Sequence, residues 1–164
     1  MCKIRLLILL LTSITFAGCN SSKNLHFDSH KFKVTHIKTE YSGLLLSNYL
    51  TAYLKSTNNY ADDSKFIING EITHNRKPFI TNKDNTSDRE QVTSTLQLFV
   101  NDNEENCKIY IHKDSVEQFY IYAPSSKLLS NKNALKKIER DNTEILASKF
   151  ISILLRLDPT CKKN

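Results

Sequence analysis

Alternation of apolar and polar side chains in the middle of the chain constrains the fold more than any other feature. From residue 92 to residue 100, one side of an extended chain carries Val92, Leu96, Leu98 and Val100, and the other carries Thr93, Thr95, Gln97 and Phe99. A turn rich in Asn, Asp and Glu follows at 101–106, and apolar residues return at 109–123, with a bulge or bend expected at Lys113-Asp114. Two long strands joined by so short a turn predict an antiparallel hairpin.

The same periodicity predicts two more strands and two helices. Strands are expected at 32–37 and 66–72, and Pro78 either ends the second strand or marks a sheet edge. Between them, Ser42 can cap a helix whose apolar stripe consists of Leu46, Tyr49, Leu50, Tyr53 and Leu54. A longer helix is expected from about Lys132 to Leu157, where Asp158-Pro159 ends it. Its apolar face consists of Leu135, Ile138, Ile145, Leu146, Phe150, Ile153, Leu154 and Leu157.

This order of elements, β-α-β-β-β-α, predicts an α+β fold. Two helices would pack on one face of a small, mostly antiparallel four-stranded sheet. We expect a single domain at 32–158 and a loose tail at 159–164. A chain of this length buries enough surface to fold without a metal or a disulfide.

The beginning of the chain predicts a lipid-anchored envelope protein. Lys3 and Arg5 precede an apolar stretch from Leu6 to Ile14, and Phe16-Ala17-Gly18-Cys19 has the pattern of a bacterial lipobox. We therefore expect residues 1–18 to be a signal peptide, Cys19 to be lipidated, and 19–31 to form the lipidated tether. The apolar stretch is shorter than the roughly 20 residues that cross a bilayer. The alternative is an ordinary cleaved signal peptide in which the cysteine is coincidental.

Charge gives weaker guidance about partners. Removing residues 1–18 takes away Lys3 and Arg5, so the 23 basic residues fall to 21 against 17 acidic ones. A basic surface suits phosphorylated lipid or nucleic acid, but the abundance of Lys, Asn and Ile is also typical of coding bias. Nucleic acid is not expected as a partner, since an exported lipoprotein does not meet it and no zinc-finger or glycine-rich spacing is present.

Two cysteines, Cys107 and Cys161, would remain free after processing and lipidation. Outside the cytoplasm they can pair, and a bridge would close a long loop between the middle of the chain and its end. The sequence does not show whether their Cα atoms lie within bonding reach. Neither has a Cys or His at zinc-binding spacing.

The mature chain resembles the lipopolysaccharide-assembly lipoprotein family LptE. The resemblance rests on the lipobox, on the element order, on Asp88-Arg89 before the strand that contains Val92-Thr93-Ser94-Thr95-Leu96-Gln97-Leu98, and on the long last helix from Glu139-Arg140-Asp141-Asn142 to Leu155-Arg156-Leu157. It departs from the family after Cys19, where Asn20-Ser21-Ser22 replaces the usual glycine and aromatic residue. The resemblance implies a plug inside the outer-membrane barrel LptD, with no enzymatic activity and no cofactor.

The resemblance also implies that basic residues contact lipopolysaccharide. Arg89 matches the family's basic position at the start of the third strand, and Lys132, Lys136 and Lys137 lie near a second such position. An arginine fork suits a phosphate because it donates two parallel hydrogen bonds. Lysines at a helix start also oppose the helix dipole, which suggests a role other than stability. The alternatives are a solvated strand end for Arg89 and a solvated helix start for the lysines.

No catalytic or metal constellation emerges from the residues. His26 and His30 would meet only on a helix, which the surrounding pattern disfavours. His36, His74 and His112 are scattered on expected strands, so we interpret them as satisfied or exposed side chains. The serines at 47, 94 and 115 lack a nucleophile-elbow pattern, and the acidic pairs at 62–63 and 104–105 fall in polar loops.

We therefore expect an outer-membrane lipoprotein that faces the periplasm, binds the LptD barrel and lipopolysaccharide, and meets the membrane through its N-terminal lipid. Asn20 follows Cys19 in place of the Asp that retains lipoproteins at the inner membrane. The alternative function is an auxiliary lipoprotein of a lipid-transport ABC system, which would bind an apolar ligand. An envelope hydrolase is a third possibility, and it would need a catalytic cleft.

Overall fold

The computed structural model describes residues 30–39, 41–79, 89–121 and 128–161. The signal peptide, Cys19, most of the tether and His26 lie outside these residues. Within them the chain forms β1 (Phe32–Lys38), α2 (Tyr41–Ser56), β2 (Phe66–Phe79), β3 (Arg89–Asp102), β4 (Cys107–Ile121) and α3 (Leu128–Leu154). The α+β class and the β-α-β-β-β-α order are confirmed.

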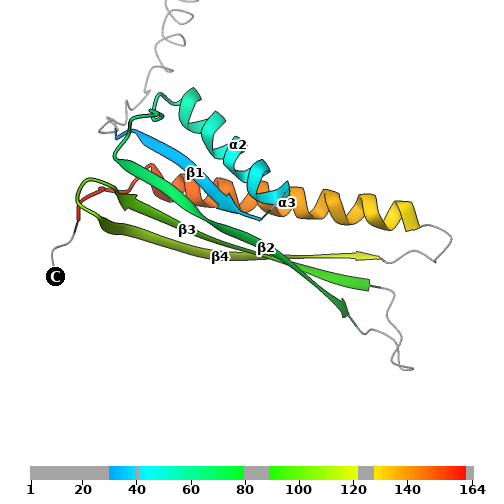
Figure 1. The fold of residues 1–164 in the computed structure, drawn as a ribbon. Helices are drawn as coiled ribbons and strands as arrows, with labels where there is room; N and C mark the ends of the chain where they lie inside the picture. Colours follow the sequence, from blue (N-terminus) through cyan, green and yellow to red (C-terminus); the bar gives the residue numbers. More distant parts are fainter. Residues whose placement is uncertain (1–29, 40, 80–88, 122–127, 162–164) are drawn as a thin grey trace, which may run out of the picture.

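The four strands form one open sheet in the order β1-β2-β3-β4. The pair β1 and β2 is parallel and is joined through α2, whereas β2, β3 and β4 are successive antiparallel strands. Both helices lie on the same side of the sheet (Figure 1) and contact each other there. The expected layering, with two helices on one face, is therefore present.

The core lies between the helices and the inner face of the sheet. Every second residue of β3 from Val92 to Asp102 is buried, which matches the alternation in the sequence. Leu46, Leu50 and Phe150 fill the space opposite these strands and are fully buried. The core thus forms where the apolar faces of the helices and strands meet.

Several expectations about local structure are wrong. The strand β4 continues without interruption through Lys113-Asp114, and its register shift lies instead where Val100 and Asn101 of β3 face Tyr110 and Lys108. The last helix begins at Leu128, four residues before the expected start, and Ile145 is exposed on it. Ser42 lies inside α2, which begins at Tyr41, so it is not the residue that precedes the helix.

Pro78 marks a sheet edge, as one of the two expectations had it. It pairs with Glu90 of β3, while β1 accompanies β2 only as far as Glu71. The far half of β2 is thus open on one side, and a proline is tolerated there because no ladder hydrogen bond is needed on that side.

Candidate functional site

The face of the sheet that points away from α2 and α3 has no described element covering it (Figure 1). Four large apolar side chains on this face are 44–71% exposed: Phe79, Ile111, Phe119 and Ile121. The rings of Phe79 and Phe119 lie 5.1 Å apart, edge to face, across β3. We call these four residues the open-face patch. Phe79, Phe119 and Ile121 lie together at one end of the face, and Ile111 lies eight residues along β4 from Phe119. Exposed apolar side chains that lie together are typical of an interaction surface.

Arg89 belongs to the same face as the patch. It is the first residue of β3, and its register partners are Phe79 on β2 and Ile121 on β4. Side chains opposite each other in a sheet share a face, so the Arg89 side chain leaves the sheet between Phe79 and Ile121, which are both exposed. The sequence identified Arg89 but not its apolar neighbours, although alternation along β4 would have placed Phe119 and Ile121 together.

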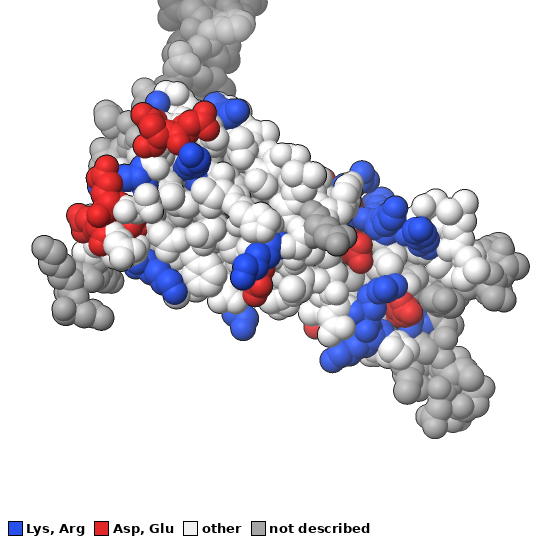
Figure 2. All heavy atoms as spheres, in the orientation of Figure 1, with Lys and Arg blue, Asp and Glu red and all other residues white. Residues whose placement is uncertain are grey.

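Lys132 and Lys136 lie on the other side of the sandwich. Both are exposed on α3, one turn apart. Because α3 begins at Leu128, neither lies in its first turn, and the expectation that they oppose the helix dipole is wrong. Basic side chains gather over this part of α3 and near the ends of β2 and β3, whereas acidic ones gather at the opposite end of the molecule (Figure 2). The structure does not bring Arg89 and the two lysines onto one surface.

A groove of about 850 Å³ separates the start of α2 from α3. Its walls carry Lys136, Lys137, Glu139 and Arg140 of α3, and its floor includes Ser42 and His74. Lys137 forms an ion pair with Asp141 one turn along the helix. The charged side chains of the groove are therefore mainly basic.

A chain of polar side chains runs beneath this groove. His74 Nε2 lies 2.9 Å from Ser42 Oγ, and His74 Nδ1 lies 2.7 Å from Ser94 Oγ. Asn142 Nδ2 donates to Ser94 Oγ at 2.9 Å. Ser42, Ser94 and Asn142 are buried, and burial lowers the pKa of His74 against a smaller opposing effect of Glu139. We call these four residues the polar bridge.

The polar bridge was not found from the sequence. His74 was expected to be satisfied or exposed, and it is satisfied. A signal was available, because His74 and Ser94 occupy inward positions of strands whose neighbouring inward residues, Ile72 and Leu96, are apolar. A serine next to a histidine also suggests a nucleophile and a base, but the group that orients this imidazole is the Ser94 hydroxyl and not a carboxylate.

A second histidine, His112, is buried between β4 and α3. Its ring lies 5.5 Å from that of Phe150, and its Nε2 has no hydrogen-bond partner among the described residues. Burial lowers its pKa; Asp114 opposes this, while Lys149 lowers it further. His36, by contrast, is exposed on β1.

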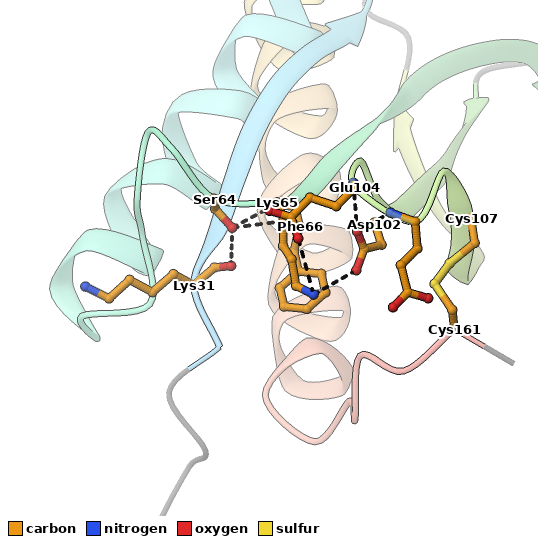
Figure 3. A network of polar contacts seen from close by, with 9 residues as sticks. Lys31, Ser64, Lys65, Phe66, Asp102, Glu104, Cys107 and Cys161 are labelled. Atoms are coloured by element: carbon orange, nitrogen blue, oxygen red, sulfur yellow. Dashed lines mark hydrogen bonds and ion pairs between the residues drawn. A yellow bond between two sulfur atoms is a disulfide. The ribbon is translucent and has the colours of Figure 1, made fainter.

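Cys107 and Cys161 form a disulfide in the structure, with their Cα atoms 6.2 Å apart (Figure 3). The bridge joins the start of β4 to the segment after α3. The Glu105 carboxylate lies within 4.8 Å of both sulfurs, but sulfurs joined to each other are not thiolate ligands.

Asp102 organises the neighbouring turn of the hairpin. Its Oδ1 accepts hydrogen bonds from the backbone N–H groups of Glu104 and Glu105, and its Oδ2 lies 3.2 Å from Lys65 Nζ (Figure 3). The hydrogen bond from Glu105 foremost, with further contributions from Lys65 and Glu104, lowers the pKa of Asp102. These contacts fix the end of the molecule near the disulfide.

The fold is shared with solved structures of lipoproteins. A minor lipoprotein from Acinetobacter baumannii superposes with a TM-score of 0.59 at 12% identity, covering 81% of this chain and 98% of that one. Rare lipoprotein B from Shewanella oneidensis gives 0.54 at 11% identity, covering 77% and 98%. A candidate lipoprotein from Caulobacter crescentus CB15 gives 0.55 at 14% identity, covering 76% and 88%. At these identities the similarity establishes the fold.

No protein-family model and no curated protein matches the sequence. Neither of the described helices is long and apolar enough to cross a membrane.

Proposed function

We propose that this protein is a non-enzymatic outer-membrane lipoprotein that docks onto an LptD-type barrel and supports lipopolysaccharide export. The open-face patch is the observation that carries the proposal. Phe79, Phe119 and Ile121 meet at one end of an uncovered sheet face, with Arg89 between them in register. The lipobox, the sequence resemblance to LptE and the fold shared with lipoproteins support it.

Docking through the sheet face follows from the energetics of exposed apolar side chains. Covering a large apolar side chain is worth about 1.5–3 kcal/mol, so four such residues favour a partner strongly. A permanent complex would bury on the order of 2,000 Å² or more, which the four residues alone do not supply. The polar open-face residues of β2, β3 and β4 would therefore form the rest of the contact.

Anchoring through Cys19 would place this docking surface at the membrane. Metabolic labelling with a radioactive fatty acid should mark the wild-type chain and leave Cys19→Ser unmarked. Equal labelling of both would show that the cysteine is coincidental.

Lipopolysaccharide would meet the protein at two separate places in this proposal. Arg89 lies on the open face, and Lys132 and Lys136 lie on α3, so the three do not grip one phosphate. Each is instead suited to a separate anionic group on the lipid.

The alternative, an auxiliary lipoprotein of a lipid-transport ABC system, needs an apolar ligand site. The groove beside α2 has apolar lining, but it also carries Lys136, Glu139 and Arg140, whose charges an apolar ligand would not match. Capture of an ABC transporter in the experiment below would favour this alternative function.

Affinity capture from gently solubilised outer membranes tests the proposal. The tagged wild-type chain should retain a large barrel protein, and Ile121→Glu should lose most of it because a carboxylate would enter an apolar contact. Leu44→Glu is the matched control: Leu44 is 61% exposed on α2, against 71% for Ile121, and does not belong to the open face. Recovery of the wild type as a free monomer, or with an ABC transporter, would overturn the proposal.

A further inference from the structure

The polar bridge links four elements across the sandwich. Ser42 comes from the first turn of α2, His74 from β2, Ser94 from β3 and Asn142 from α3. It lies where the apolar core ends, one inward position beyond Ile72 and Leu96. Its hydrogen bonds therefore hold the start of α2 to α3 and the sheet at the floor of the groove.

Every hydrogen bond along the bridge is satisfied when the imidazole is neutral. Asn142 donates to Ser94, so the Ser94 hydroxyl is satisfied when it donates in turn to His74 Nδ1. The Nε2–H then donates to Ser42 Oγ. Each hydroxyl oxygen in this arrangement accepts one hydrogen bond, and the neutral ring uses both nitrogens.

Protonation of His74 would break this order. Both ring nitrogens would then donate, and Ser94 Oγ would face donors from His74 and Asn142 while its own proton lost its acceptor. Asn142 could accept that proton only by turning its amide over so that Oδ1 replaces Nδ2 beside Ser94, and its side chain is fully buried. A buried polar group left unpaired destabilises the structure around it.

The surroundings of His74 also disfavour a positive charge. Among the described residues that line the groove, Glu139 is the one carboxylate, whereas Lys136, Lys137 and Arg140 are basic. On the helices, the titratable or charged residues around His74 are Tyr41 of α2 and four residues of α3: Lys136, Lys137, Glu139 and Arg140. On the sheet, Arg76 is the next inward residue of β2, and β3 contributes the uncharged Ser94. Burial lowers the pKa of His74, and the Glu139 carboxylate opposes this effect.

We propose that His74 is a proton-controlled latch, and that its protonation frees the first turns of α2 from α3 and the sheet and so widens the groove. This inference is independent of docking, since it concerns the helix-covered face. Neutral conditions keep the latch closed, and acidification opens it while the rest of the core stays folded.

Hydrogen exchange of the full lipidated chain in detergent tests the latch. Protection of the amides at 42–47, corrected for intrinsic exchange, should fall roughly tenfold between about pH 7.5 and pH 5, whereas β3 should stay protected. His74→Asn, which keeps a polar side chain but does not titrate, should remove this pH response. His36→Asn, which changes an exposed histidine, should keep it. Protection that is equal at both pH values, or a response that His74→Asn retains, would overturn the proposal.

A measurement on the wild type covers the case in which His74→Asn does not fold. Imidazole ¹⁵N chemical shifts should show the proton on Nε2 of His74 near pH 7.5, and the loss of protection should follow the titration of this ring. A proton on Nδ1, or titration of His74 without loss of protection at 42–47, would refute the latch.

Discussion

Arg89 illustrates how one residue can serve two kinds of contact. Its position between Phe79 and Ile121 gives it an apolar setting, and its planar guanidinium can hold a phosphate through two hydrogen bonds. An amphiphilic ligand or an apolar partner with an anionic edge would match that combination. The residue is exposed, so its charge adds little to folding.

We predict that Arg89→Glu weakens lipopolysaccharide binding by roughly tenfold, about 1.4 kcal/mol, without changing the circular dichroism spectrum. Binding should also weaken as salt rises through physiological strength, where the screening length is about 8 Å. Lys113→Glu is the control, because Lys113 is exposed on the same face but pairs with Gln97, eight residues along β3 from Arg89. An unchanged affinity in folded Arg89→Glu would reduce Arg89 to a solvated strand end.

His112 makes stability depend on pH. Its pKa is lowered from an ordinary value of 6.5, mainly by burial against α3. The folded state therefore holds the ring neutral, and the unfolded state takes up a proton first as the pH falls. Its contribution is fully present above about pH 6.5 and is lost as the pH falls toward the lowered pKa. Asp102 and Asp114, whose pKa values are also lowered, act at more acidic pH.

We predict that His112→Phe makes the free energy of unfolding fall less steeply between about pH 6.5 and pH 5. One histidine adds at most about 1.4 kcal/mol per pH unit to this slope. Denaturant titrations at a series of pH values would measure it, with exposed His36→Asn as the unaffected control. A slope equal to that of the wild type would show that His112 is not responsible.

At the scale of elements, α2 lies unusually close to β1. A Cβ atom on Gly43 would lie 2.5 Å from the carbonyl oxygen of Ile37 and 2.9 Å from that of Lys38. Both neighbours are backbone atoms, which cannot move aside as a flexible side chain would. The absence of a side chain at residue 43 thus sets how closely the helix approaches the strand.

We predict that Gly43→Ala destabilises the protein by about 1–3 kcal/mol through this overlap. The direction of this stability change is informative, because replacing glycine by alanine at an unobstructed helix position would stabilise the protein by about 1 kcal/mol. Asn48→Ala on the exposed side of α2 is the control and should be close to neutral. Thermal or denaturant unfolding would measure both, and a stabilised Gly43→Ala would contradict the close packing.

The elements that the sequence predicts best are those with strict periodicity. Val92 to Val100 alternates apart from Ser94 on the inward side and Phe99 on the outward side, and β3 follows this alternation. The start of α3 was missed because Leu128 and Leu129, which open it, are exposed and carry no amphipathic signal. The bend expected at Lys113-Asp114 was wrong because Asp114 forms an ion pair with Lys149 of α3 and stays in the ladder.

At the scale of the whole molecule, the candidate sites depend on contacts far apart in the sequence. The polar bridge joins residues from 42 to 142, and no short motif announces it. The open-face patch likewise needs the register of three strands before Phe79, Arg89 and Ile121 become neighbours. Sequence periodicity shows which side chains point outward, but only the fold shows that no described helix or strand covers one face of the sheet.

The uneven distribution of acidic and basic side chains distinguishes the two ends of the molecule. The loop with Asp62 and Asp63 follows Tyr60, which bridges to Phe32 at the start of β1, and Glu104 lies 3.9 Å from Lys65 nearby. Acidic side chains gather at this end of the molecule, and basic ones gather toward the other (Figure 2). The open-face patch lies mostly at the basic end. A partner that seats on it should therefore combine an apolar contact with acidic groups.

Site-specific photo-crosslinking in intact cells tests the docking claim most directly. A photoreactive side chain at Ile121 should give one adduct with a large outer-membrane barrel, which mass spectrometry would identify. The same group at Leu44, equally accessible but on α2, should give none. Absence of a barrel adduct from position 121, or a barrel adduct from position 44 alone, would contradict docking through the uncovered sheet face.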